Sequence, residues 1–374
     1  MEMAPPGYLR PRETAPLTTE EDARIARICP GLGQRVEAAG RRDDVLWGPF
    51  ERVSIGFATD PELRFTASSG GGLSAILAYL LESKAVDAVI QTAASLEVPV
   101  ANRTVLSKSA SDVLASAGSR YAPSAPLAAL APHLDSDLRF AFVGKPCDVA
   151  ALRALEAEDP RIAARVPYML SFFCAGVPSQ TGGEAVLKAL GTDVQKTESF
   201  RYRGHGWPGR ATARLKDGTE RSMTYHESWG KILSNHTQLR CKICADGTGK
   251  AADVVCADAW HCDDKGYPLF EESDGLSLVV ARTSTGMAVT DAAEKAGKIV
   301  LDSFDLTDLP SMQPGQFNRR RAVLSRLAGL CLLGRPIPRY RGLHLFAAAR
   351  QNSLAASLRN VVGTLRRGLG GRLG

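Results

Sequence analysis

The chain has 374 residues, 44% of them hydrophobic and 23% charged, which is the balance of an ordinary soluble globular protein with one large or two modest domains. No run of about 18 apolar residues occurs, which excludes a membrane-spanning helix, and the start MEMAPPGYLRPRE lacks the apolar core of a signal peptide. A cytoplasmic location is therefore expected, where eight cysteines indicate a metal site or catalysis more often than disulfides.

The net charge of +6 is unevenly distributed along the chain. Between Arg319 and Gly374 there are 12 arginines and no lysine, aspartate or glutamate, so the rest of the chain holds 34 basic and 40 acidic residues. A basic tail can bind an anionic partner or the surface of an anionic membrane. A solvated surface whose helices pack on the protein explains it equally well, and no binding to nucleic acid is expected.

The predicted elements begin with an irregular segment, residues 1–48, that is rich in Pro, Arg and Glu and contains a short helix near 20–28. RVSIGFA then predicts a strand, TASSGGGLSAILAYLLES a glycine-rich loop that leads into an amphipathic helix, and VDAVIQTA the next strand. The stretches LRFAFVGKPCDVAALRALEA and VPYMLSFFCAGVPSQTGGEAVLKALG each repeat the order strand, loop, helix. This alternation predicts an α/β fold with a mainly parallel sheet and βαβ crossovers.

The texture changes after Gly191. TESFRYRGHGWPGRATARLKDGTERSMTY has short alternating runs and an Asp217–Gly218 turn, which predict a smaller antiparallel part next to the cysteine-rich segment. LSLVVARTSTGMAVTDAAEKAGKIVLDSF predicts a strand, a helix and another strand, and the chain beyond Pro310 is predicted to be helical. The expected regions are an N-terminal segment (1–48), a cofactor-binding domain (49–310) and a helical basic C-terminal region (311–374).

Two cysteines come directly after predicted parallel strands. Cys147 comes after LRFAFVG and Cys174 after YMLSFF, so both are expected at the edge of the sheet where open α/β proteins bind ligands. Each could instead be a small buried hydrophobic residue.

The stretch RCKICADGTGKAADVVCADAW contains a C-x-x-C pair, Cys241 and Cys244. A local site would add Cys256 and Cys262 (or His261) and bind zinc, whereas a distributed site would add Cys147 and Cys174 and bind a [4Fe–4S] cluster. The pair could also be a redox dithiol, and spacing alone does not choose between these alternatives.

Three loops have the composition of a nucleotide or flavin site. SSGGG, residues 68–72, precedes a helix, so its backbone N–H groups could hold a phosphate, although an ordinary tight turn also explains it. AGSRYAPS (117–124) and RYRGHGWPG (201–209) combine cationic and aromatic side chains. Either of these two stretches alone could be a plain surface loop.

Taken in order, these stretches resemble the beta subunit of coenzyme F420-reducing hydrogenase and its wider flavoprotein group, which includes F420-dependent dehydrogenase subunits and plant hydroxymethyl-chlorophyll reductases. The similarity runs from about residue 53 to residue 280, in SSGGGLSAILAYLLE, AGSRYAPS, FVGKPCDVAALRAL, FFCAGVPS, YRGHGWPG and RCKICADGTGKAADVVCADAW. The resemblance implies an FAD-binding α/β domain with an adjacent [4Fe–4S] cluster, which together couple one-electron donors to hydride transfer to or from an organic substrate.

The resemblance also implies the roles of particular residues. Cys147, Cys174, Cys241 and Cys244 would be the cluster ligands. Ser69, Gly70 and Gly71 would bind the FAD phosphates, and Ser119, Arg120 and Tyr121 would contact the flavin or its ribityl chain. The implied FAD site also includes Ser68, Lys145, Arg203 and Trp207. No catalytic residue, substrate or oligomeric state is predicted.

The chain departs from this family in two places. Relatives often begin with a ferredoxin-like region of C-x-x-C-x-x-C runs, which is absent here, although GYLRP and ICPG look like the residues that come after such a run. The expectation is that this region was lost or that the chain starts at an internal Met, so that a separate ferredoxin or other electron donor is needed. Cys256 and Ala257 also replace the small residue and the glycine common in relatives, which suggests that Cys256 is a spare thiol. A non-catalytic accessory protein and a zinc-binding interaction protein are the alternatives.

Overall fold

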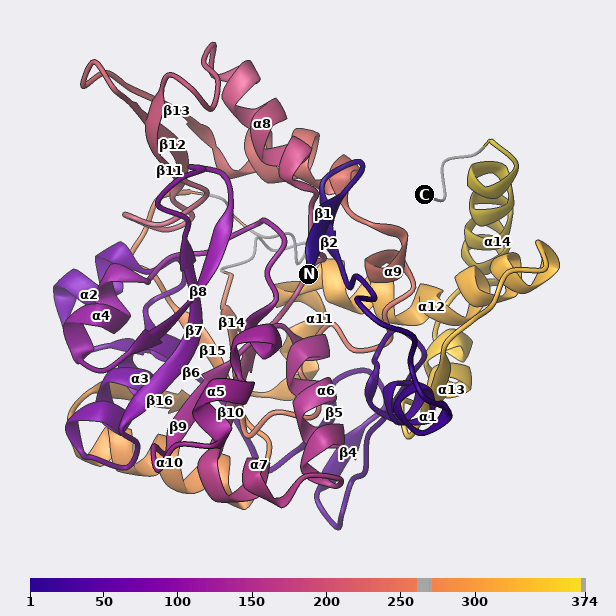
Figure 1. Cartoon of the computed structure of the whole chain (residues 1–374), viewed down its shortest axis with the longest axis horizontal. Coiled ribbons are helices and arrows are strands. Elements are labelled where there is room, and N and C mark those ends of the chain that lie inside the picture. The colour runs from indigo at the N-terminus through magenta and orange to yellow at the C-terminus, as the bar shows by residue number, and fades with distance from the viewer. Residues whose placement is uncertain (261–268, 270, 371–374) are drawn as a thin grey trace.

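The computed structural model describes residues 1–260, 269 and 271–370, and its main feature is a sheet of eight strands in the order β16-β6-β15-β14-β10-β9-β7-β8 (Figure 1). The central strands β14, β10, β9 and β7 pair in parallel, while β15, β6, β16 and β8 are added by antiparallel pairing. Five of the eight strands, those four and β6, therefore run in one direction, which confirms the predicted α/β class. The strands are β6 (Arg52–Ala58), β7 (Ala88–Ala94), β8 (Asn102–Ser107), β9 (Phe140–Val143), β10 (Tyr168–Phe172), β14 (Val254–Asp258), β15 (Ser277–Ala281) and β16 (Ile299–Ser303).

Helices cover both faces of this sheet because the side chains of each buried strand alternate between the two faces. In β9, Phe140 and Phe142 pack with α6 (Pro146–Glu156) and α7 (Pro160–Arg165), whereas Ala141 and Val143 pack with α3 (Gly72–Glu82) and α10 (Ser284–Lys295). The crossovers predicted from the repeated order of strand, loop and helix are α3 between β6 and β7 and α6 between β9 and β10.

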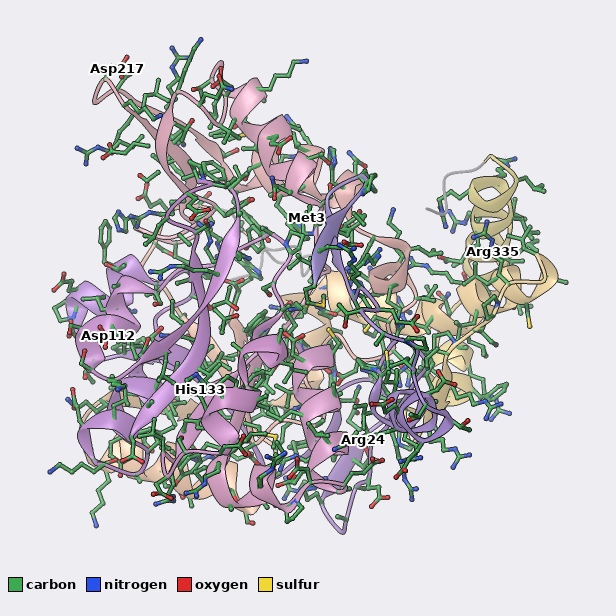
Figure 2. The ribbon with its side chains drawn as sticks, in the orientation of Figure 1. Met3, Arg24, Asp112, His133, Asp217 and Arg335 are labelled. Carbon is green, nitrogen blue, oxygen red and sulfur yellow. The ribbon has the colours of Figure 1, made fainter. Side chains whose placement is uncertain are left out.

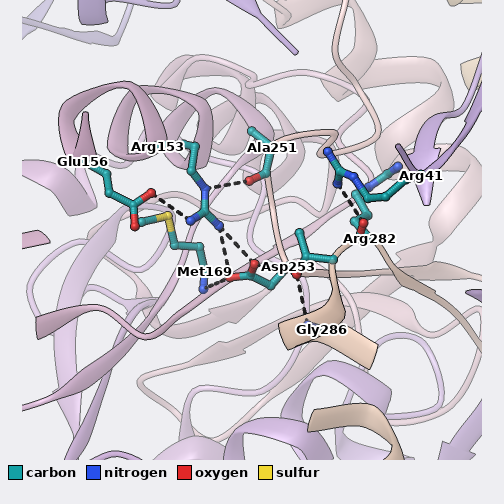
Figure 3. A network of polar contacts seen from close by, with 9 residues as sticks. Arg41, Arg153, Glu156, Met169, Ala251, Asp253, Arg282 and Gly286 are labelled. Carbon is teal, nitrogen blue, oxygen red and sulfur yellow. Dashed lines mark hydrogen bonds and ion pairs between the residues drawn. The ribbon is translucent and has the colours of Figure 1, made fainter. Parts of the chain in front are cut away.

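A polar network ties α6 to the amino ends of β10 and β14 (Figure 3). The Asp253 carboxylate accepts a hydrogen bond from the backbone of Met169 at 2.9 Å and pairs with Arg153 at 3.1 Å, and Arg153 also donates to the Ala251 carbonyl at 3.2 Å. Leu170 pairs with a residue of β9 on one side and a residue of β14 on the other. These contacts fix the three strands in register, so that their carboxyl ends meet at the opposite edge.

A second, three-stranded antiparallel sheet consists of β11 (Thr197–Arg201), β12 (Arg210–Leu215) and β13 (Glu220–Thr224). It lies beside α8 (Gln180–Ala189) at one end of the molecule (Figure 1). β12 and β13 are joined at Asp217, whose side chain accepts from the Thr219 N–H at 2.9 Å, and Gly218 there has a φ of 86°. The segments η2 (His226–Ile232, a π-helix), η3 (Leu233–His236) and α9 (Leu239–Lys242) then lead into the cysteine-rich stretch.

The N-terminal residues are more ordered than the sequence predicted. The expected helix is α1 (Thr19–Ile28), which begins with a capping box between Thr18 and Glu21. Short strands also form: β1 (Glu2–Ala4) pairs with β2 (Tyr8–Arg10), and β4 (Arg42–Asp44) pairs with β5 (Gly48–Phe50). Strands of three residues carry no detectable hydrophobic period, which is why sequence analysis missed them.

The C-terminal region is helical as predicted, with α12 (Pro314–Leu332), α13 (Leu345–Arg350) and α14 (Leu354–Leu369). Between α12 and α13, the strand β17 (Arg339–Arg341) pairs in parallel with β3 (Gly33–Arg35), which joins the two terminal regions. The remaining short helices are α2 (Pro61–Thr66), α4 (Ala110–Ala115), η1 (Pro126–Ala129), α5 (Ala131–Leu134), η4 (Leu306–Asp308) and α11 (Leu309–Met312). None of the helices in the described residues combines the length and apolar content needed to cross a membrane.

Candidate cofactor site

A cavity of about 300 Å³ opens at the carboxyl edge of the large sheet, beyond the ends of β9, β10 and β14. Most of the residues predicted to bind a cofactor line it, and they come from five separate stretches of the chain. The predicted residues in its wall are Ser68, Ser69, Gly71, Ser119, Arg120, Tyr121, Lys145, Cys174 and Arg203. The position agrees with the general rule that open α/β sheets bind ligands outside the carboxyl ends of their strands.

The glycine-rich loop and the 117–124 stretch meet at this cavity. The Ser119 N–H donates to the Ser68 hydroxyl at 2.5 Å, and the Ser69 hydroxyl donates to the Ala257 carbonyl at 2.9 Å. Gly71 occupies the N-cap of α3 and has no side chain to cap it, while Leu73 and Ser74 of the first turn line the cavity. Uncapped N–H groups at the start of a helix are suited to bind an anion such as phosphate.

The glycines of the loop are required by its packing on the protein. Gly70 and Gly71 have φ values of 66° and 74°, in the left-handed region. A Cβ atom on Gly70 would lie 2.7 Å from the Gly275 carbonyl oxygen, and one on Gly71 would lie 3.0 Å from the Cβ of Ala58. Gly70 is not among the residues of the cavity wall. A side chain at either position would therefore push the loop away from its neighbours rather than fill the cavity directly.

Arg120 lies in the cavity wall, but most of its guanidinium N–H groups are already used by the protein. It donates to the Asn102 side chain at 2.9 Å and to the carbonyls of Phe200, Pro99 and Ala101 at 2.8, 3.2 and 2.8 Å. These bonds tie the 117–124 stretch to the start of β8 and the end of β11. Arg120 therefore holds the 117–124 stretch in place, and this stretch places Tyr121 in the cavity wall.

Arg203 is also paired within the protein. Its guanidinium forms two hydrogen bonds with the Asp258 carboxylate, at 2.6 and 2.8 Å, and the indole N–H of Trp207 donates to the same carboxylate at 2.9 Å. Burial alone lowers the pKa of Arg203, but Asp258 raises it above its usual value. Trp207 stacks on Trp260 at 4.8 Å between ring centroids and lies behind the cavity wall. The Arg203–Asp258 ion pair forms the floor of the site.

Sequence analysis missed the aromatic side of the cavity. Tyr225 and Trp229 line it together with Tyr121, whose ring lies 4.9 Å from that of Trp229 and 6.5 Å from that of Tyr225. Asp258 and Trp260 also line it, and both belong to the CADAW stretch, in which the sequence analysis singled out only Cys256 and Ala257. Tyr225 and Trp229 come after an antiparallel sheet and have no local signal of binding, so sequence offered no means to find them.

The four predicted ligand thiols gather beside this cavity. Cys147 lies in the first turn of α6 after β9, Cys174 two residues after β10, Cys241 in α9 and Cys244 two residues beyond α9. The backbone brings them together: Cys174 N–H donates to the Gly247 carbonyl at 2.8 Å, and Val177 N–H donates to the Cys241 sulfur at 3.3 Å. Cys174 also lines the cavity, so the four thiols lie directly beside the cavity.

These thiols affect one another electrostatically. Burial raises the pKa of Cys174 to about 12, and the Cys241 and Cys244 thiols contribute to that rise. Burial raises the pKa of Cys244 to about 11, with further contributions from Asp246 and Cys241. The pKa of Cys147 rises well above its usual value through burial and Asp148, with smaller contributions from Cys174 and Cys244. Buried thiols of this kind ionise only when a metal or another positive charge stabilises the thiolate.

Cationic side chains surround the thiols. Lys145 forms an ion pair with Asp148 at 2.7 Å and donates to the Ser124 hydroxyl at 2.8 Å. Arg319 of α12 donates to the Cys174 and Ala175 carbonyls, and its charge lowers the pKa of Cys174. The first arginine of the arginine-rich tail is therefore part of this site.

The N-terminal and C-terminal regions hold the C-x-x-C segment in place. Tyr8 donates to the His236 carbonyl at 2.5 Å. Arg240 donates to the Tyr340 hydroxyl at 2.6 Å and to the Pro30 carbonyl, and Tyr340 donates in turn to the Ile243 carbonyl at 2.9 Å. Both terminal regions are therefore part of the architecture of the thiol site.

Cys256 is separate from the four thiols. It lies in β14 and packs in the apolar cluster that contains Val143 and Leu170, and burial alone raises its pKa to about 12. Cys262 and His261 lie outside the described residues. Among the residues that are described, no three His, Cys, Asp or Glu side chains converge closely enough to bind one metal ion.

Fold and site together define an α/β protein with a ligand cavity and a group of four thiols at the carboxyl edge of its sheet. Two models of the coenzyme F420 hydrogenase/dehydrogenase beta subunit match the chain, one of its N-terminal part at residues 53–131 and one of its C-terminal part at residues 137–306. The chain belongs to the coenzyme F420 hydrogenase/dehydrogenase beta subunit family, which confirms the resemblance seen in the sequence.

Individual relatives are subunits of oxidoreductases. The chain is 26% identical to coenzyme F420 hydrogenase subunit beta of Methanococcus voltae, over 78% of this chain and 99% of that protein. It is 24% identical to F420-dependent formate dehydrogenase 1 subunit beta of Methanococcus maripaludis, over 64% of each chain. A chain of the F420-reducing [NiFe] hydrogenase complex from Methanosarcina barkeri has a similar fold, with a TM-score of 0.58 and 19% identity over 76% of this chain and 95% of that chain.

Proposed function

We propose that this protein is an FAD- and [4Fe–4S]-dependent oxidoreductase subunit that exchanges electrons between a protein donor and an organic hydride acceptor or donor. One observation carries the proposal: Cys174 belongs both to the group of four thiols and to the wall of the cavity. A cluster held by these thiols and a flavin in this cavity would be in direct proximity. When bound, the flavin supplies hydride chemistry and the cluster supplies one-electron transfer.

The arrangement of the four thiols favours binding of a cluster over binding of a single zinc ion. Tetrahedral zinc–thiolate bonds of about 2.3 Å place the four sulfurs only about 3.8 Å apart. The described residues contain no group of three His, Cys, Asp or Glu side chains that could hold a single ion, although Cys174 and Cys244 are near enough for Cys244 to raise the pKa of Cys174. A four-iron cluster is larger than one ion and takes four thiolates that stand further apart. The nearby charges of Lys145, Arg240 and Arg319 favour the thiolate form of these cysteines, which either kind of metal site requires.

The cavity supports a flavin nucleotide. The start of α3 provides the Leu73 and Ser74 N–H groups for the pyrophosphate, whereas the Gly72 N–H already donates to the Ser277 hydroxyl at 3.1 Å. Tyr121, Tyr225 and Trp229 provide aromatic faces, and the Arg203–Asp258 pair provides a rigid floor. In this arrangement the chain's own residues bind and orient the cofactor and exclude water from one side of it. F420 is the coenzyme named in several relatives, and we extend it to this chain only as one candidate substrate.

The experiment is anaerobic purification with iron, sulfide, zinc and flavin analysis. We expect about four iron and four sulfide per chain, the content of one [4Fe–4S] cluster, and FAD in similar amount to the chain. Cys174→Ser should lose the iron, whereas Cys331→Ser, at an exposed cysteine, should keep it as a matched control. Iron that survives Cys174→Ser but is lost in Cys256→Ser would contradict the distributed site. Stoichiometric zinc without iron or flavin would favour the zinc-binding alternative, and bound cofactors without substrate-dependent bleaching would favour the non-catalytic one.

A further inference from the structure

Helix α14 presents its apolar face to solvent. Leu354, Leu358, Val362 and Leu369 recur at helical spacing along it, and all four are exposed, Leu354 by 90% and Leu369 by 82%. Surface helices of globular proteins normally turn such a stripe toward the core. The stripe runs the length of the helix, which is about 24 Å at 1.5 Å per residue. A contiguous exposed stripe of this kind marks a surface that binds a partner.

Specific contacts hold α14 in this orientation. On its inward face the buried Thr364 packs on Gly329 of α12, where a Cβ atom would lie 2.8 Å from the Thr364 Cβ, and Asn360 accepts a hydrogen bond from Arg326 at 3.0 Å. Arg326 also donates to the Lys242 carbonyl in the C-x-x-C segment at 2.8 Å. The polar and small side of α14 is therefore the side that fits α12, and rotation of the helix to bury its leucines would break these contacts.

The charge around the stripe has one sign. Arg359 and Arg366 are carried on α14 with the leucines, and no aspartate or glutamate occurs between residues 309 and 374. The same region exposes additional arginines and apolar side chains. One of them is Arg335 in the turn after α12, which is labelled in Figure 2 at one end of the molecule. These additional exposed residues are Leu332, Arg335, Ile337, Arg339, Arg341, Phe346 and Arg350.

We propose that α14 lies on the surface of an anionic lipid bilayer, with its leucine stripe among the upper acyl chains and its arginines at the headgroups. An exposed leucine stripe on a helix whose only charged residues are arginines, and which is too polar to span, is the pattern of an interfacial helix. Each arginine near an anionic surface adds to the affinity, and the apolar stripe supplies the second contribution that stable attachment needs. A protein partner of ordinary composition would not require every charge in this region to be positive. This inference is independent of the cofactors proposed above.

Vesicle flotation with the full-length protein tests the proposal. Wild-type protein should float with vesicles of phosphatidylglycerol and phosphatidylcholine, and should stay in the bottom fraction with phosphatidylcholine alone. The double variant Leu354→Glu/Leu358→Glu should weaken binding by roughly tenfold or more, because it removes part of the apolar stripe and adds negative charges that the anionic lipids repel. Arg359→Glu/Arg366→Glu should act similarly and make the remaining binding less sensitive to salt.

Matched controls use exposed residues elsewhere on the chain. Leu96→Glu, at a leucine that is 82% exposed, and Lys188→Glu/Lys216→Glu should bind vesicles like the wild type. Thermal unfolding of every variant should match the wild type, because none of these side chains is buried. Binding equal to wild type in both α14 variants overturns the proposal. Failure of the wild type to bind anionic vesicles, together with self-association that Leu354→Glu/Leu358→Glu abolishes, also overturns it and assigns the stripe to a second copy of the chain.

Discussion

Replacing Asp258 with asparagine tests whether the floor of the cavity depends on a buried ion pair. Arg203 is only 2% exposed, and the Asp258 carboxylate accepts two of its hydrogen bonds and one from Trp207. Asparagine keeps the size of the side chain but removes its charge. The variant would leave the guanidinium buried without a counterion.

The cost follows from that geometry. Breaking a buried ion pair by removing one partner typically costs about 3–5 kcal/mol. Arg203 keeps its hydrogen bond to the Pro208 carbonyl and its position over the Tyr225 and Trp260 rings, and asparagine retains one carbonyl oxygen as an acceptor. We therefore expect a loss near the lower limit, about 3 kcal/mol of the free energy of unfolding. Flavin occupancy should fall with it, because Arg203 and Asp258 both line the cavity.

Urea denaturation followed by tryptophan fluorescence measures this loss. The matched control is Glu198→Gln, which removes the charge from an exposed ion pair with Arg214 at 3.2 Å and should cost less than about 1 kcal/mol. The double variant Arg203→Met/Asp258→Asn should be more stable than Asp258→Asn alone, because it no longer buries an uncompensated charge. A cost for Asp258→Asn as small as that of the control, or no recovery in the double variant, would refute the reasoning.

Three further predictions concern the loop and the thiols. Gly70→Val should destabilise the protein by more than about 2 kcal/mol and lower its flavin content, because the new side chain would collide with the Gly275 carbonyl and the positive φ disfavours valine. The control Gly218→Ala has a positive φ but open space around it, so it should cost about 1 kcal/mol and keep the flavin, as measured by denaturation and flavin analysis. Arg319→Gln should make the midpoint potential of the proposed cluster more negative, on the order of tens of millivolts, in a redox titration followed by electron paramagnetic resonance, while the exposed Arg210→Gln should leave it unchanged. In metal-free protein the raised pKa values of Cys244 (about 11) and Cys174 (about 12) should stabilise the folded state below the unfolded thiol pKa of about 8.5, and this stability should be lost as the pH rises toward 11–12. Between pH 7 and pH 10, the free energy of unfolding should therefore fall less in Cys174→Ser than in the wild type, as measured by denaturation at the two pH values.

The sequence by itself determined the features that depend on local signals. The alternation of strands and helices between residues 53 and 190, the placement of Cys147 and Cys174 after strands, and the glycine loop before α3 all follow from short stretches with a clear period or turn. The parallel pairing of β9 with β10 then brings the two cysteines to one edge, as predicted. Local periodicity is enough for these features because each is set by residues that are near one another in the chain.

Only the tertiary structure decided which residues share a site and which side chains are already paired. Arg120 and Arg203 had the composition of ligand-binding residues, yet their guanidinium groups meet Phe200 and Asp258, which lie 80 and 55 residues away. The separation of Cys256 from the other thiols and the outward leucine face of α14 likewise depend on how distant elements pack. Composition shows that a charge or an apolar stripe exists. The residues that contact it depend on the packing of segments that are distant in the sequence, so they cannot be predicted from one segment alone.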